Sequence, residues 1–141
     1  MSDEEKLNDL LARLAERPDD PDLLRQTAYQ HDRMGLEHEA VPYYERALEL
    51  AQEDRLGLWT GYGSTLRVIG RFEDAVAAFD RGLAEFRGDP ALRAFRAMAC
   101  YNLGRSREAV GELLHLLAEK EQLGGYERPA AYYADHLDET V

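Results

Sequence analysis

The sequence predicts an all-α protein built from three stacked copies of a two-helix unit, and three observations support this class. First, Gly35, Gly70 and Gly104 lie 35 and 34 residues apart, which is the length of a helix–turn–helix repeat. Second, each glycine is followed five residues later by alanine and nine residues later by a large apolar residue: Ala40 and Tyr44, Ala75 and Phe79, Ala109 and Leu113. Third, apolar residues recur with helical spacing, and no segment shows the two-residue alternation of a half-buried strand.

Each helix can be placed along the chain. The first, over 3–16, carries a stripe of leucines at Leu7, Leu10, Leu11 and Leu14. Pro18 and Pro21 end it and start the next helix, with Asp20 as the N-cap. Paired helices are then expected over 21–34 and 38–51, 55–69 and 72–86, and 90–103 and 106–122, each pair turning at its glycine. A last helix is expected over 128–139, with Tyr133 and Leu137 facing inward.

Length and charge bound the possible functions. The chain of 141 residues is too short for more than one domain, and its formal net charge is −11. Residues 1–24 hold eight acids and three bases, residues 25–107 twelve of each, and residues 108–141 eight acids and two bases. Acidic ends around a neutral middle argue against binding to nucleic acid or to an anionic membrane surface. The acidic start of the chain and the single cysteine, Cys100, indicate a cytoplasmic protein.

On these residues the chain resembles the tetratricopeptide repeat family. The second repeat carries the fullest pattern, with Trp59, Tyr62, Gly63 and Leu66 followed by Gly70, Ala75 and Phe79. The run from His31 to Leu48 is most similar to the small bacterial stand-alone proteins of tetratrico peptide repeat domain group 5.

The resemblance covers about residues 21–123 and implies a right-handed superhelix, an α-solenoid, of three repeats. The repeats are expected at 21–54, 55–89 and 90–123. A leading half-repeat helix over 3–17 and a C-terminal capping helix over 126–139 complete one domain, 1–141.

No arrangement of reactive side chains indicates catalysis. The four histidines are scattered, and none shares a helix face with a second histidine at a metal-binding spacing. Gly61 to Ser64 lacks the Gly-x-Ser-x-Gly pattern of a nucleophile elbow. We therefore expect no enzymatic activity, no cofactor and no metal.

The resemblance implies that the first helix of each repeat lines a concave groove. The lining residues it implies are Arg25, Tyr29, Asp32 and Arg33 in the first repeat, Thr60, Ser64 and Arg67 in the second, and Phe95, Met98, Tyr101 and Asn102 in the third. The expected function is a non-catalytic scaffold that binds a peptide or helix of a partner protein in this groove. The three arginines favour an acidic or amphipathic peptide. The alternative is a structural protein that forms a homodimer through the groove or an end helix. Whether the last helix covers Phe95, Met98 and Tyr101 stays open.

Overall fold

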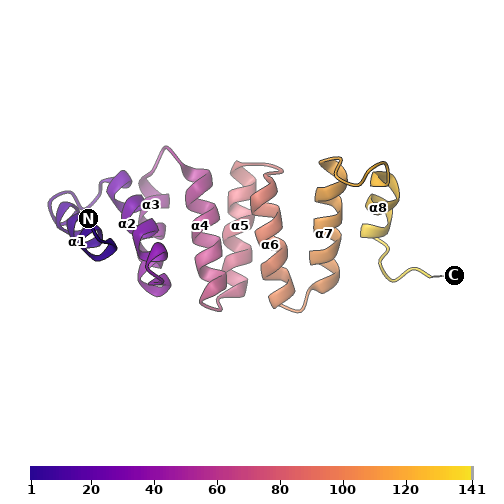
Figure 1. Cartoon of the computed structure of the whole chain (residues 1–141), viewed down its shortest axis with the longest axis horizontal. Helices are drawn as coiled ribbons and strands as arrows, with labels where there is room; N and C mark the ends of the chain where they lie inside the picture. Colours follow the sequence, from indigo (N-terminus) through magenta and orange to yellow (C-terminus); the bar gives the residue numbers. More distant parts are fainter. Residues whose placement is uncertain (141) are drawn as a thin grey trace.

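The computed structural model describes residues 1–140, which form eight helices and no strand. The helices follow one another along the long axis of the molecule, with the two termini at opposite ends (Figure 1). Their bounds are α1 Asp3–Glu16, α2 Pro21–Arg33, α3 Glu37–Leu50, α4 Arg55–Val68, α5 Phe72–Glu85, α6 Pro90–Asn102, α7 Ser106–Glu119 and α8 Glu127–Ala134. None of these helices combines the length and apolar composition needed to cross a membrane.

Local sequence signals explain most of the helix ends. Ser2 forms a capping box with Glu5 at the start of α1. Asp20 and Asp89 cap α2 and α6, each directly before a proline in the first turn. Gly35 turns the first hairpin with a φ of 72°, a conformation that only glycine adopts without steric cost.

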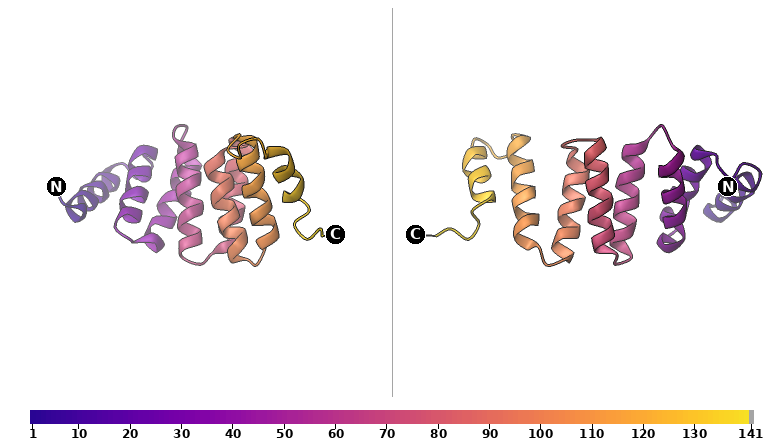
Figure 2. Two further views of the ribbon diagram at one scale, coloured as in Figure 1. Left: turned by 45° about the vertical axis from the view of Figure 1, so that its right-hand side comes forward. Right: turned by 180° about the vertical axis from the view of Figure 1, so that it is seen from behind.

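The helices pack as a solenoid in which each helix lies against the next. The first helix of the second hairpin, α4, also contacts α2 and α6, whereas the second helices α3, α5 and α7 do not contact one another. Because only the first helices of successive hairpins contact one another, they form the inner side of the row of helices that Figure 2 shows from two further directions. The last helix, α8, contacts only α7 within the described chain.

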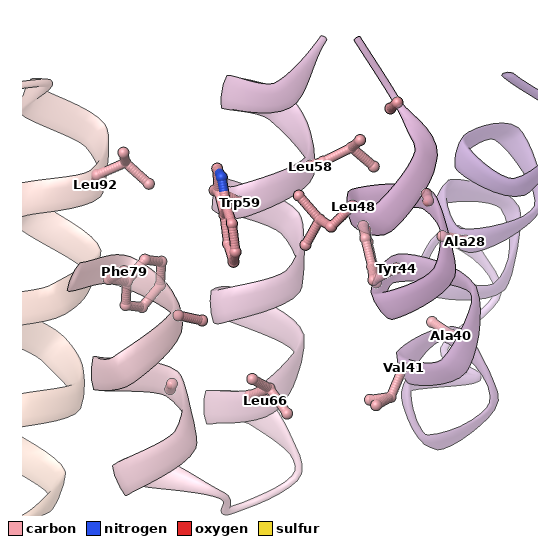
Figure 3. Close-up of a cluster of buried hydrophobic side chains, with 14 of the residues drawn as sticks. Ala28, Ala40, Val41, Tyr44, Leu48, Leu58, Trp59, Leu66, Phe79 and Leu92 are labelled. Atoms are coloured by element: carbon pink, nitrogen blue, oxygen red, sulfur yellow. The ribbon is translucent and has the colours of Figure 1, made fainter. Parts of the chain in front are cut away.

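The core runs along the hairpins and is centred on three aromatic side chains, Tyr44, Trp59 and Phe79, all with at most 1% of their surface exposed (Figure 3). Close helix contact makes room for them. A Cβ at Gly61 would lie 2.6 Å from the Tyr44 hydroxyl, and a Cβ at Gly63 would overlap the Phe79 ring. The predicted burial of Tyr44 and Phe79 between successive hairpins is confirmed.

The last two helices end earlier than predicted. Helix α7 ends at Glu119 rather than at 122, because the chain enters the left-handed conformation at Glu121 (φ 55°). Helix α8 ends at Ala134 rather than at 139, where the chain turns and Asp135 bonds to His115 of α7.

The packing of this end also differs. Tyr133 and Leu137, expected to face inward, are 51% and 37% exposed, whereas Ala134 of the same predicted stripe is buried against Gly111 of α7. Leu113, predicted to fill the space beyond the third hairpin, is 40% exposed although α8 packs against α7, so α8 covers this position only in part.

Candidate functional site: the inner groove

All eleven residues predicted to line the groove lie on the three inner helices α2, α4 and α6. Seven are partly exposed: Arg25, Tyr29, Asp32, Thr60, Ser64, Arg67 and Phe95. Four are exposed: Arg33, Met98, Tyr101 and Asn102. The structure thus brings them onto neighbouring helices, but several of their polar groups are used within the protein.

Arg25 and Tyr29 form one cluster with Asp54 at the N-terminal end of the groove. The Tyr29 hydroxyl donates to the Asp54 carboxylate at 2.9 Å, and the Arg25 guanidinium pairs with the same carboxylate at 3.0 Å. Arg25 also pairs with Asp22. Burial and the Asp54 carboxylate raise the pKa of Tyr29, and the hydrogen bond from Arg25 lowers the pKa of Asp22. Two carboxylates share the charge of Arg25, so this end is less basic than the sequence suggested.

Sequence reasoning missed Asp54. It directly precedes α4, where aspartate usually caps the helix. Here it has a φ of 52° and makes no capping bond, and its carboxylate reaches back to α2 in the preceding repeat. The only sequence signal was an acidic residue at a helix start, which does not indicate a contact with Tyr29.

Asp32 joins three helices. Its carboxylate accepts hydrogen bonds from the Tyr44 hydroxyl of α3 and from the Thr65 hydroxyl of α4, the latter at 2.7 Å. Burial raises the pKa of Asp32, and these two hydrogen bonds oppose the rise. The second carboxylate oxygen is buried and has no hydrogen-bond partner within residues 1–140. Asp32 therefore links both helices of the first repeat to the first helix of the second repeat.

The remaining polar residues differ in how freely they face the groove. Arg33 pairs with Asp3 of α1 at 3.1 Å, and Thr60 donates to the Leu56 carbonyl of its own helix at 2.7 Å. Arg67 donates to the side chain of Asn102 at 3.1 Å, which links α4 to α6. Within the described chain Arg67 has no carboxylate partner, so it retains an uncompensated positive charge at the centre of the groove.

The third repeat forms an open apolar end. Phe95 is partly buried and stacks on Phe79 with ring centroids 6.4 Å apart. Met98 is 40% exposed and Tyr101 is 66% exposed. Because α8 contacts α7 and not α6, it does not cover these side chains. The question left open by the sequence is answered: the C-terminal helix does not occupy the groove.

The groove combines one uncompensated arginine with exposed apolar and aromatic side chains. Cys100 is fully buried, and residues 1–140 contain no group of three or more His, Cys, Asp or Glu side chains placed to hold a metal ion. What the groove presents is an arginine near its middle and an exposed thioether and phenol at one end. Such side chains supply apolar area together with hydrogen-bonding groups, as interface residues do.

Comparison with known families gives one match. The family model described as tetratrico peptide repeat, of group 5, matches residues 21–137. The match extends beyond the expected 21–123 and includes α8. No curated protein matches the chain.

Proposed function

The chain belongs to the tetratricopeptide repeat family, a family of protein-interaction modules, and from that premise we propose that it is a non-catalytic cytoplasmic scaffold that binds a peptide or helix of a partner protein in its inner groove. The observation that carries the proposal is the exposure of Met98 and Tyr101 beside Arg67, on a face that no other helix within residues 1–140 covers.

The side chains of the groove favour a particular class of peptide. Exposed aromatic residues and arginines contribute a large share of interface energy, because they bury much area and still offer polar contacts. The uncompensated charge of Arg67 favours an acidic group on the ligand, and Met98 and Tyr101 favour an apolar side chain next to it. The expected ligand is therefore an acidic or amphipathic peptide.

The test begins with affinity capture from the native host and uses the captured protein in calorimetric titrations. The substitutions Tyr29→Ala and Tyr101→Ala each weaken binding by about 1–2 kcal/mol if these side chains are anchors. The matched control is Tyr126→Ala, which removes a tyrosine that is 72% exposed outside the groove. Circular dichroism verifies folding, since Tyr29→Ala also removes the hydrogen bond to Asp54.

Two results would contradict the proposal. If only Tyr126→Ala weakens binding, the partner contacts the C-terminal end rather than the groove. If the wild-type chain sediments as a tight dimer that Tyr101→Ala dissociates, the groove serves self-association, which is the alternative function.

A further inference from the structure

We propose that Arg67 and Asn102 together form a subsite of the inner groove that binds the side-chain carboxylate of an internal aspartate or glutamate in the partner peptide. Asn102 determines this specificity, because it holds the Arg67 guanidinium without neutralising it. The subsite rests on the groove function proposed above, and it names the chemical group that the groove recognises.

The arginines of the inner helices differ in how their charge is compensated. Helices α4 and α6 contain four arginines and no acidic residue. Three of them pair with carboxylates of the outer helices α5 and α7 at 2.5–2.7 Å: Arg55 with Glu85, Arg93 with Glu112, and Arg96 with Asp80. For the fourth, Arg67, no carboxylate oxygen within residues 1–140 comes within 4.0 Å of the guanidinium. In a chain with a formal net charge of −11, this arginine therefore lacks an acidic neighbour.

Arg67 also differs from the other two arginines predicted to line the groove. Arg25 and Arg33 both pair with carboxylates of the chain. Arg67 lies in the last turn of α4, where the helix dipole contributes at most about half a negative charge. A net positive charge therefore stays on this part of the groove, and the complementary group of a ligand is an anion.

Asn102 positions this charge without cancelling it. The Arg67 guanidinium donates a hydrogen bond to the side-chain oxygen of Asn102 at 3.1 Å. Because a guanidinium can only donate, this bond fixes the orientation of the amide and leaves its NH₂ group as a donor beside the arginine. An aspartate in this place would accept the same bond and neutralise the arginine, as Asp54 does for Arg25. Arg67 and Asn102 thus offer neighbouring N–H groups to one anion, and a carboxylate can accept from both.

The surroundings of the subsite favour an internal acidic residue over a C-terminal carboxylate. Val68, next to Arg67 on α4, is 60% exposed, and Met98, one turn before Asn102 on α6, is 40% exposed. A peptide that ended at the subsite would extend from it in one direction only. An internal aspartate or glutamate has peptide on both sides, which can cover the apolar side chains of both helices.

The position of Met98 also sets a spacing within the ligand. Four residues separate Met98 from Asn102, which corresponds to about 6 Å along the axis of α6. Alternate residues of an extended peptide are about 6.6 Å apart, and residues four apart in a helical peptide are about 6 Å apart along its axis. The ligand should therefore carry an apolar residue two or four positions from its acidic residue.

The test begins with a library of random peptides whose C-termini are joined to a phage coat protein, so that only side-chain carboxylates are offered. The peptides that the full chain retains should share an acidic residue at one of these two spacings from an apolar residue. One such peptide is then made with a fluorescent label and an amidated C-terminus, and its binding is followed by fluorescence anisotropy. Replacing its acidic residue by the corresponding amide should weaken binding by about tenfold, and added salt should weaken binding of the acidic peptide.

Three protein variants locate the subsite. Asn102→Asp supplies a carboxylate to Arg67 from the chain itself and should weaken binding of the acidic peptide by at least about tenfold. Arg67→Gln removes the positive charge and should have a similar effect. The matched control is Arg81→Gln, because Arg81 also lacks a carboxylate within 4.0 Å inside residues 1–140 but lies on the outer helix α5, where it stacks on Trp59. This control should leave binding unchanged.

A second measurement separates loss of the subsite from damage to the groove. The peptide with the amide in place of its acidic residue should bind the wild type and Asn102→Asp within about twofold, because it does not use the charge of Arg67. Circular dichroism verifies folding of each variant. If Arg67→Gln disrupts folding, Asn102→Asp decides the test, since Asn102 is exposed and the substitution keeps its size.

Several results would overturn the inference. These are no enrichment of acidic residues among the retained peptides, or equal binding of the acidic peptide by the wild type, Asn102→Asp and Arg67→Gln. If these variants bind normally while Tyr101→Ala weakens binding, the proposed function stands and the carboxylate subsite does not. A peptide that binds more than about tenfold tighter with a free C-terminus would identify a terminal carboxylate as the ligand group, which also contradicts the inference. A library from which the wild type retains no peptide counts against both the subsite and the proposed function.

Discussion

Phe79 and Leu113 occupy the same position in successive repeats, so substitution of both by alanine measures how much a covering helix contributes. Phe79 is fully buried and stacks on Phe95, so Phe79→Ala leaves a cavity in the core. A phenylalanine side chain buries roughly 150–250 Å², and its removal from a core costs about 3–5 kcal/mol. Leu113 is 40% exposed, so Leu113→Ala loses only part of its burial and costs about 1 kcal/mol.

The assay is urea unfolding followed by helical circular dichroism and by the fluorescence of Trp59, which is 1% exposed in the same core. Since a domain is stable by about 5–15 kcal/mol, Phe79→Ala should remove a large part of the total. It should lower the melting temperature by roughly 10–20 °C, against a few degrees for Leu113→Ala. Equal losses for the two variants would refute the reasoning, because Leu113 would then be covered as fully as Phe79.

Three further predictions concern other parts of the molecule. Gly63→Ala gains about 1 kcal/mol of helix propensity but places a Cβ against the buried Phe79 ring. Urea unfolding should therefore show that the free energy of unfolding falls by about 1–2 kcal/mol, and adding Phe79→Leu should restore part of this loss. Burial raises the pKa of Asp32 in the folded state, so folding favours the protonated carboxyl group. The free energy of unfolding of the wild type relative to Asp32→Asn should therefore be greatest below about pH 3.9 and should fall as the pH rises through the folded pKa. Urea titrations that show no such trend would contradict this. Deleting residues 126–141 uncovers α7 around Gly111, so it should lower the melting temperature by several degrees and promote association. A truncated chain that stays monodisperse with an unchanged melting temperature would show that the tail is dispensable.

Much of the groove could be located from the sequence, but its charge could not. The period of the glycines places Arg25, Arg67 and Tyr101 on the first helices of their hairpins, and the family resemblance implies that these helices line the groove. Arg25 then meets Asp54, 29 residues away, and Asp32 meets Thr65, 33 residues away. Such pairs depend on how neighbouring repeats are rotated against each other, and this rotation cannot be predicted from a local sequence pattern.

The sequence by itself determined the helical class, the three hairpins and the burial of Tyr44 and Phe79, because turn glycines and apolar spacing act locally and are repeated along the chain. Only the tertiary structure decided how exposed Leu113 is and where α8 ends. A residue at a stacking position is buried only when the next helix lies over it, and a terminal repeat has no such neighbour in its own pattern. The exposed stripe on α7 therefore follows from where the helices sit and not from which residues form it.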